Sequence, residues 1–357
     1  MIIRMSGSRG TKQVAVIGAS GYTGAELLRL LAGHPHFSVK VATGDSQAGT
    51  RAADLYPNLA GSYPDLVFAP TDPATVADRV DGADVVFLGL PHEASLALAP
   101  SLVGRVGCVV DLSAAYRLKR SDAYPLYYGF EHDQPALLAE AVYGLPERHR
   151  RALSGARLVA TPGCYVTAAT LALAPLVDAG LIADEGVIVD AASGVSGAGR
   201  APKPNTMFCT VDEDFTAYGL LDHRHTPEME EQIGARLLFT PHLAPMNRGI
   251  LATCYANPAG GRTGDSIDDS TVLEVLRAAY ADEPFVVVRD DVPSTKATLG
   301  SNAVHLTARY DARTGTVVAI AALDNLCKGA SGGAVQAANV ALGIEETAGL
   351  SAVGVYP

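Results

Sequence analysis

The amino-terminal part of the chain alternates short apolar runs with segments that have the apolar spacing of helices. Apolar runs of this kind, each followed by a helical segment, are typical of parallel strands joined by crossover helices. The predicted strands are 13–17, 39–43, 85–90 and 108–112, and the predicted helices include 25–31 and 93–103. This alternation predicts an α/β fold with a doubly wound parallel sheet.

The pattern changes in the second half of the chain. After an Ala/Leu-rich helix predicted over 165–177, the apolar runs follow one another too closely for crossover helices. The runs are 187–191, 237–242, 249–255, 285–288, 303–310 and 316–323. They predict a second α+β domain with a mixed or antiparallel sheet. A last helix, 331–342, is rich in small residues and is predicted to return to the first domain. We therefore assign 1–164 and 325–357 to the first domain and 165–324 to the second.

A glycine-rich turn joins the first predicted strand to the first helix. The spacing of Gly18, Gly21 and Gly24 lets the backbone approach a pyrophosphate, with the N–H groups of the helix start pointing at the phosphates. We predict dinucleotide binding in a Rossmann-type domain, although such turns also simply connect strands to helices. The predicted contacts in the turn are Gly18, Ser20, Gly21, Tyr22, Thr23 and Gly24.

The residues after the second strand bear on the choice between NAD and NADP. Asp45 stands where an acid would accept a hydrogen bond from the 2′-hydroxyl of NAD. Ser46 and Arg51, with Lys40, are instead suited to the 2′-phosphate of NADP. The residues alone leave both interpretations open, since an Asp in a polar loop is also simply solvated.

Cys164 is the residue around which the second half is organised. An apolar run ends at residue 160, Pro162 and Gly163 break it, and the predicted helix follows at once. A thiol at a helix N-terminus is stabilised as the thiolate by the helix dipole and by unpaired N–H groups. We therefore predict a nucleophile, against the plain alternative of a small apolar side chain packed in a turn.

Loops at the carboxyl ends of predicted strands supply further candidates. Pro91 and His92 are expected near the cofactor, and Arg117 is suited to clamp a substrate carboxylate or phosphate, unless it is a surface residue. The loop 193–200 is rich in small residues and hydroxyls, which suits anion capture by backbone N–H groups, although a mobile Gly/Ser linker has the same composition. From this part of the chain Ser193, Gly194 and Asn325 are predicted to contact the cofactor.

Two histidines precede the next predicted helix, in which Thr226 is the expected N-cap and Pro227 the first helical residue. A histidine is the usual acid/base partner of a catalytic thiol. The spacing does not decide between His223 and His225.

Composition and charge exclude several classes of protein. With 357 residues, 48% of them hydrophobic, the chain can bury more than one core. A net charge of −11 and the lack of a Lys/Arg run argue against a nucleic-acid partner. No apolar stretch is suited to cross a membrane, and 1–12 lacks the apolar core of a signal peptide and is expected to be a disordered start. The five scattered cysteines indicate neither a disulfide framework nor a zinc site, so no metal and a reducing cytoplasm are expected.

Five motifs together resemble the N-acetyl-γ-glutamyl-phosphate reductase family, which is related to the aspartate-semialdehyde and glyceraldehyde-3-phosphate dehydrogenases. They are GASGYTGAE at 18–26, PGCYVT at 162–167, SGVSGAGR at 193–200, HRHTPE at 223–228 and DNLCKG at 324–329. The resemblance covers nearly the whole chain. It departs from the family pattern at Asp45, where relatives often carry a basic or hydroxyl residue, and at Ala115, where many carry an acid.

The resemblance implies an activity and roles for residues. Cys164 would attack an acyl phosphate to form a thioester, NADPH would reduce the thioester to the semialdehyde in arginine biosynthesis, and His223 would be the acid/base. A homo-oligomer, a tetramer or a dimer, is also implied. The residues expected around the substrate are Arg117, Ser196, Arg200, Tyr218 and Glu228.

Two alternatives need nearly the same residues. A related enzyme would act on aspartyl phosphate or on a carrier-bound aminoadipyl phosphate. A non-catalytic NADP(H)-binding redox sensor would instead use the fold without hydride transfer.

Overall fold

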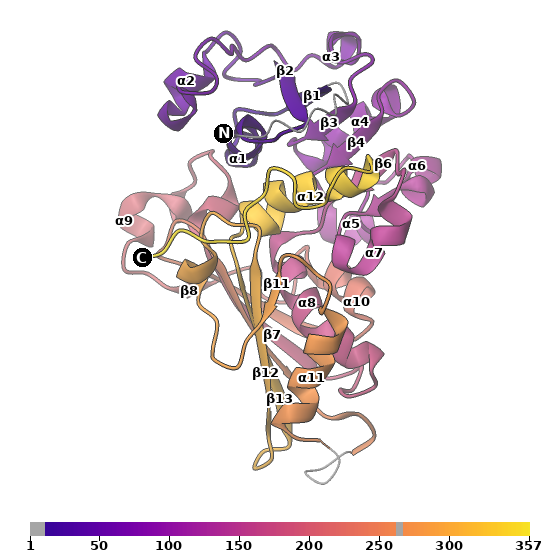
Figure 1. Cartoon of the computed structure of the whole chain (residues 1–357), viewed down its shortest axis with the longest axis vertical. Helices are drawn as coiled ribbons and strands as arrows, with labels where there is room; N and C mark the ends of the chain where they lie inside the picture. The colour runs from indigo at the N-terminus through magenta and orange to yellow at the C-terminus, as the bar shows by residue number, and fades with distance from the viewer. Residues whose placement is uncertain (1–10, 262–266) are drawn as a thin grey trace, which may run out of the picture.

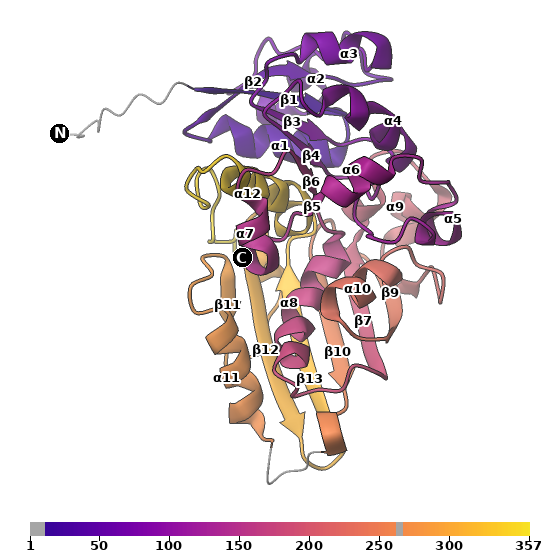
Figure 2. The same ribbon diagram turned by 90° about the vertical axis from the view of Figure 1, so that its right-hand side faces the viewer.

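The computed structural model describes residues 11–261 and 267–357, so most of the start predicted over 1–12 lies outside the described residues. Two sheets lie end to end along the long axis of the molecule, each with its own helices (Figures 1 and 2). Their strands come from separate parts of the chain, up to residue 160 for the first sheet and from residue 187 for the second. The carboxyl-terminal helix α12, Gly332–Ala341, packs back on the first sheet.

The first sheet is parallel throughout, with strand order β2-β1-β3-β4-β6-β5. Its strands are β1 Lys12–Ile17, β2 Phe37–Ala42, β3 Val85–Leu88, β4 Cys108–Asp111, β5 Val142–Tyr143 and β6 Leu158–Ala160. The order reverses between β1 and β3, and ligands of such sheets bind outside the carboxyl ends of the strands at this point. The two-residue β5 corresponds to none of the predicted strands.

Helices cover both faces of the first sheet, as the sequence predicts for a doubly wound fold. On one face α1, Tyr22–Ala32, and α12 bury Leu28 and Val335 against β1 and β3. On the other face α3, Pro73–Arg79, and α4, His92–Leu102, bury Val76 and Leu96. The remaining helices of this part are α2 Ala52–Leu55, α5 Ala123–Tyr128, α6 Pro135–Glu140 and α7 Pro146–Leu153.

The second sheet is mixed, with strand order β11-β12-β13-β10-β7-β9-β8. Its strands are β7 Val187–Gly194, β8 Thr216–Ala217, β9 Leu237–Ala244, β10 Ile250–Ala256, β11 Val286–Val288, β12 Val304–Asp311 and β13 Thr316–Leu323. The pairs β7/β9 and β11/β12 are parallel and the other pairs antiparallel, which confirms the expected mixed sheet.

One face of the second sheet is covered by helices, which lie in front of the strands in Figure 2. They are α8 Cys164–Asp178, α10 Thr226–Ile233 and α11 Asp269–Ala279, and their apolar side chains share one core with the strands. Along β10 every second residue is fully buried in this core while Leu251, Thr253 and Tyr255 between them are more exposed. The alternation shows that the opposite face of the sheet is less covered.

Helix α10 corrects one expectation from the sequence. The helix starts at Thr226, so His225 and not Thr226 is the N-cap, and its side chain makes no capping hydrogen bond. Pro227 is accordingly the second helical residue. A proline fits either of the first two positions, because neither needs a backbone N–H.

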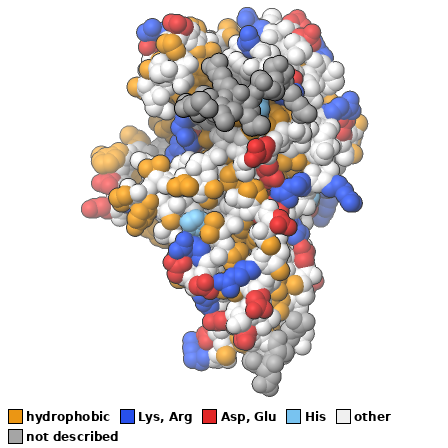
Figure 3. Space-filling view, in the orientation of Figure 1, with side chains coloured by type: hydrophobic (Ala, Val, Ile, Leu, Met, Phe, Trp, Pro, Cys, Tyr) orange, Lys and Arg blue, Asp and Glu red, His pale blue; other side chains and the backbone are white. Residues whose placement is uncertain are grey.

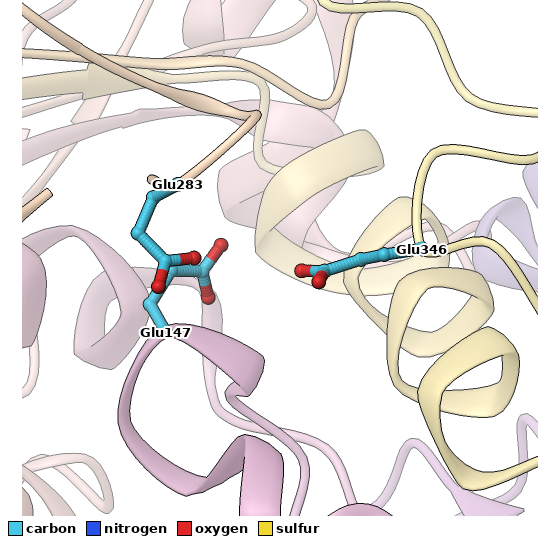
Figure 4. A group of neighbouring side chains, drawn as sticks. All are labelled: Glu147, Glu283 and Glu346. Carbon is cyan, nitrogen blue, oxygen red and sulfur yellow. The ribbon is translucent and has the colours of Figure 1, made fainter. Parts of the chain in front are cut away.

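Three glutamates from distant stretches meet beside the junction of the two sheets (Figure 4). Within the described residues, Glu147, Glu283 and Glu346 are the one group of acidic side chains close enough to share a cation. Arg150 already donates to both oxygens of Glu283 and of Glu346, and Lys328 donates to Glu147. The group is therefore an ion-pair network between elements, and a metal ion would have to displace Arg150.

None of the helices in the described part of the chain combines the length and apolar character of a membrane span.

Candidate active site

A cavity of about 380 Å³ lies between the two sheets, and most of the predicted site residues line it. Those residues are Thr23, His92, Arg117, Cys164, Ser193, Gly194, Ser196, Tyr218, His223, His225 and Asn325. They come from the ends of β4, β6, β7 and β8, from the starts of α1, α4, α8 and α10, and from the segment after β13. The tertiary fold thus brings together loops that are far apart in the sequence.

Cys164 is the first residue of α8, directly after the short β6, as the sequence predicts. Burial raises the pKa of its thiol to about 11, while the backbone N–H groups of Tyr165 and of Cys164 itself and the charge of Arg117 act in the opposite direction. The helix start thus favours the thiolate as expected, but the pKa of the thiol is still raised overall. The cost of burying an anion outweighs the helix N-terminus.

Two glycines leave room for the groups around this sulfur. A Cβ atom on Gly329 would lie 2.8 Å from the Cβ atom of Cys164, and a Cβ atom on Gly163 would overlap the imidazole of His225. Neither glycine has positive φ. Close packing of backbone against Cys164 and His225, and not turn geometry, explains why glycine is present at both positions.

The two histidines differ in their hydrogen bonds. Nδ1 of His223 accepts the backbone N–H of His225 at 3.1 Å, so the neutral ring of His223 carries its proton on Nε2. Burial, with the charge of Arg224, lowers the pKa of His223 to about 4, which keeps the ring neutral at pH 7. His225 is more deeply placed, burial lowers its pKa well below the usual value, and its Nδ1 has no partner among the described residues. The rings lie 4.8 Å apart, and Tyr165 contacts both edgewise.

Glu228 and Arg117, both expected at the substrate, form a buried ion pair in which Arg117 lines the cavity and Glu228 lies behind it. The carboxylate of Glu228 is fully buried and accepts from Nη1 of Arg117 at 3.3 Å, from Tyr143 Oη at 2.7 Å and from the N–H of Gly163 at 2.9 Å. Arg117 also donates to the carbonyl oxygens of Thr161 at 2.6 Å and Leu112 at 3.0 Å. The hydrogen bonds of Arg117 and Glu228 hold the backbone segment directly before Cys164. Glu228 itself does not line the cavity.

The loop after β7 is fastened to the segment after β13. The amide of Asn325 donates to Ser196 Oγ at 3.0 Å and accepts the N–H of Gly249 at 2.8 Å, while Ser193 Oγ donates to the carbonyl of Gly194. Tyr218 closes the same region by donating to Tyr165 Oη at 3.2 Å. The alternative of a loose Gly/Ser linker is therefore wrong for the first part of 193–200.

The glycine-rich turn has the geometry that a pyrophosphate needs. Gly18 has φ +82°, and a Cβ atom there would overlap the carbonyl oxygen of Gly89, while a Cβ atom on Gly24 would overlap the backbone of Ala19. Gly21 is the N-cap of α1 without a side-chain cap, and the nearest atom to a Cβ there is the Gly18 oxygen at 3.6 Å. The open backbone and uncapped N–H groups at the β1/β3 reversal fit a dinucleotide phosphate.

A second hollow, of about 430 Å³, lies beside this turn. Its lining comprises Ser20, Gly21, Ser46, Gln47, Arg200, Ala201 and Pro202. Ser46 therefore lies where the sequence places it. Arg51 does not line this hollow and pairs at the surface with Asp54 at 2.9 Å. Arg200, expected at the substrate, lies here and not in the cavity of Cys164.

Pro91 is the N-cap of α4 next to His92, whose Nδ1 accepts the N–H of Ala114 at 3.0 Å.

Sequence reasoning missed several residues of the cavity. Lys203, Asn205 and Thr206 enter it from the loop after Arg200, Arg224 lies between the two histidines, and Gly329 faces Cys164. A single lysine in a stretch rich in Pro and Ala, three residues after Arg200, was the available signal for Lys203. Nothing in the sequence marked Asn205 or Thr206.

The cavity between the two domains is lined by the helix start that follows the nucleotide-type turn and by a cysteine with two histidines. This combination defines the class of protein as a two-domain NAD(P)-dependent oxidoreductase. Two family models match the chain: semialdehyde dehydrogenase, NAD binding domain, over 13–156, and semialdehyde dehydrogenase, dimerisation domain, over 164–325. The chain belongs to the semialdehyde dehydrogenase family.

Two named relatives match nearly the full length of the chain. A protein of Acidothermus cellulolyticus named N-acetyl-gamma-glutamyl-phosphate reductase is 49% identical over 356 residues, covering 97% of this chain and 99% of the relative. A protein of Pelobacter propionicus with the same name is 44% identical over 353 residues, covering 96% and 99%. These matches confirm the family resemblance inferred from the motifs.

Solved structures agree with the two-domain fold. Aspartate semialdehyde dehydrogenase II of Vibrio cholerae, complexed with ASA, superposes with a TM-score of 0.66 at 17% identity, covering 93% of this chain and 98% of the other. The enzyme of Candida albicans with NADP has a TM-score of 0.66 at 16% identity, with the same coverage. At this identity the likeness confirms the fold alone.

Proposed function

We propose that the protein reduces N-acetyl-L-glutamyl 5-phosphate to N-acetyl-L-glutamate 5-semialdehyde and phosphate with NADPH, a step of arginine biosynthesis. The observation that carries this proposal is Cys164 at the start of α8, in a cavity that also contains the start of the nucleotide-type helix α1. Relatives that bear the name of this activity match nearly the full length of the chain.

The first chemical step uses the sulfur of Cys164. Its thiol attacks the acyl carbon, a C–S bond forms, the bond from the acyl carbon to the phosphate oxygen breaks, and the thiol proton leaves with the phosphate. No atom changes oxidation state in this acyl transfer. A thioester results, whose carbonyl stays reactive toward hydride and whose sulfur is a good leaving group.

His223 is the group that we assign to the developing negative charge. Because its Nδ1 accepts the N–H of His225, its Nε2–H is available as a donor, and its low pKa keeps it neutral. A neutral imidazole donor stabilises the oxyanion of the carbonyl carbon both during attack by sulfur and during reduction. When the C–S bond breaks, the sulfur takes up one proton from solvent through this imidazole. His225, which is packed on Gly163, is assigned to positioning.

NADPH supplies the hydride when bound, and the residues of this chain fit it through the turn of Gly18, Gly21 and Gly24. The loop of Ser193, Gly194 and Ser196, fastened by Asn325, is the wall of the cavity next to Cys164. We assign Lys203, which lines the cavity, to the charged end of the substrate; Arg117 also lines the cavity but directs one N–H of each of its three nitrogens to Thr161, Leu112 and Glu228. We assign the two domains the boundaries 164/165 and 324/325.

We also propose a homo-oligomer in a reducing cytoplasm. The less covered face of the second sheet and the apolar side chains around α9, Phe208–Val211, are surfaces that a second copy would cover. Phe208 and Leu221 are 77% and 72% exposed, and hydrophobic side chains gather on the projection that carries α9 (Figure 3). All five cysteines are unpaired thiols.

The test is phosphate-dependent reduction of NADP with N-acetylglutamate semialdehyde, run beside aspartate semialdehyde. We expect turnover with the acetylated substrate only, and loss of at least ~10³-fold in kcat for Cys164→Ser, with Cys209→Ser as the exposed matched control. Turnover of aspartate semialdehyde instead would reassign the substrate. Normal binding of NADP(H) without any turnover would favour the redox sensor.

A further inference from the structure

Arg200 belongs to the second domain by sequence but lies against the nucleotide-type turn of the first. It follows the short 3-10 helix Val195–Ala198 at the end of β7. In space it lines the second hollow, with Ser20 and Gly21 of the turn and with Ser46 and Gln47, which follow β2, and it also lines a neighbouring hollow that includes Tyr22 and Tyr56. Three separate stretches of chain therefore meet at this point.

An electrostatic effect on Tyr56, which lines the neighbouring hollow, supports the placement of Arg200 near the turn. Tyr56 Oη donates to the carbonyl oxygen of Ser20 at 2.7 Å. Burial raises the pKa of Tyr56 to about 12, and the positive charge of Arg200 acts against that rise. The guanidinium of Arg200 is thus within electrostatic range of a hydroxyl that is bonded to the turn.

The stretch after the second strand is where a dinucleotide-binding domain meets the adenosine ribose. A 2′-phosphate there carries a charge of about −1.5 to −2 at pH 7 and needs cationic and hydroxyl donors. The first domain offers Ser46 at this place, but its nearby cation, Arg51, is paired with Asp54. Arg200 makes no ion pair with an acidic residue of 11–261 or 267–357, in contrast to Arg248, which pairs with Glu26 and Asp324.

We propose that Arg200, with the hydroxyls of Ser46 and Ser20, binds the 2′-phosphate of NADP(H) and thereby selects this cofactor over NAD(H). The inference rests on the proposed function for the presence of a nicotinamide cofactor, but it moves a specificity residue from the first domain to the second. The proposal also decides between NAD and NADP, a choice that the sequence left open at Asp45. The cation that binds the 2′-phosphate is Arg200, from the loop that the sequence analysis assigned to the substrate.

The position of Arg200 couples the cofactor to the catalytic cavity. Ser196, four residues earlier on the same loop, is bonded to Asn325 in the wall of that cavity, and Lys203, three residues later, lines it. A 2′-phosphate held by Arg200 therefore orders the loop that also closes the cavity of Cys164. NAD(H), which lacks this phosphate, leaves the loop without that contact.

The test compares Arg200→Gln with Arg51→Gln, a matched removal of the surface arginine that pairs with Asp54. Adenosine 2′,5′-bisphosphate and adenosine 5′-monophosphate are titrated into each protein by calorimetry, which needs no turnover. We expect Arg200→Gln to weaken the bisphosphate by about 10- to 100-fold, as loss of a charge-assisted hydrogen bond does, and to leave the monophosphate within about twofold. Arg51→Gln should leave both unchanged.

Steady-state kinetics give a second readout. Arg200→Gln should raise the KM for NADPH by a similar factor and leave the KM for NADH unchanged, while Arg200→Lys should recover part of the loss. The inference is overturned if Arg200→Gln weakens both nucleotides equally, if only Arg51→Gln weakens the bisphosphate, or if the KM for the acyl phosphate rises instead. Selective bisphosphate binding by a protein that does not turn over would leave the inference standing and remove the proposed reaction.

Discussion

The carboxylate of Glu228 accepts a hydrogen bond of 2.9 Å from the backbone N–H of Gly163, the residue directly before Cys164. The same carboxylate pairs with Arg117, which in turn holds the carbonyl oxygen of Thr161. This one buried ion pair thus holds the backbone at Thr161 and at Gly163, and thereby positions the side chain of Cys164 in the cavity.

We expect Glu228→Ala to lower the free energy of unfolding by about 3–5 kcal/mol, because Arg117 would be left as an uncompensated buried charge. Urea denaturation measures the change, and Glu274→Ala, on the exposed side of α11, serves as the control. A loss below about 1 kcal/mol for Glu228→Ala would show that the pair is not coupled to folding.

Alkylation of Cys164 in the free protein should be slow at neutral pH. Since burial raises the pKa of the thiol to about 11, the protonated form dominates below that pH and the rate with iodoacetamide should keep rising through pH 9–10. The measurement is peptide mass spectrometry in a Cys209→Ser background, which removes the exposed thiol. A rate that levels off below pH 8 would contradict the dominance of burial.

Replacement of the two histidines should have different kinetic effects. We expect His223→Asn to lower kcat by about 10²–10⁴-fold, because the donor to the oxyanion is lost. His225→Asn should have a smaller effect on kcat and a larger one on thermal stability, since its ring fills the space over Gly163. Rates and melting temperatures of both variants decide the assignment, and the reverse pattern would exchange the two roles.

Acid should destabilise the protein below about pH 6.5. Burial lowers the pKa of His92 to about 3 and that of His223 to about 4, so below pH 6.5 the unfolded chain binds more protons than the folded one. Stability is full above pH 6.5 and is lost as the pH falls toward 4. Urea midpoints at several pH values should show a shallower loss for His92→Asn than for the exposed control His36→Asn. Equal slopes would refute the contribution of His92.

Gly329→Ala should impair catalysis more than folding. The added Cβ would lie 2.8 Å from Cβ of Cys164, so one of the two must move. Because a displacement of about 1 Å at a reacting group costs up to ~10²-fold in rate, we expect a loss of that order in kcat. Gly343→Ala is the comparison variant. A Cβ atom there meets no atom within 4 Å but φ is +64°, so its effect would come from backbone strain and not from a steric contact. Equal kcat losses in both variants would exclude the steric explanation.

Features that depend on local backbone physics could be predicted from the sequence. The turn of Gly18 to Gly24, the start of α8 at Cys164 and the return of α12 each rest on glycine geometry, a strand-to-helix break or a small-residue face. The side-chain roles of Glu228 and Arg200 could not be predicted in the same way, because each is decided by partners more than sixty residues away in the chain. The raised pKa of the Cys164 thiol could not be predicted for the same reason, because its main cause is burial, which depends on the tertiary structure.

The carboxylates around Arg150 have a mechanical consequence. Arg150 on α7 forms ion pairs with Glu283 of the second domain and with Glu346 near the carboxyl terminus. Lys328, after β13, forms an ion pair with Glu147 on α7. Of these pairs only Arg150–Glu283 joins the two domains, so moving one domain away from the other would break this one ion pair. The other two pairs tie the carboxyl-terminal segment to helix α7 within the first domain, so they would stay intact if the two domains moved relative to each other.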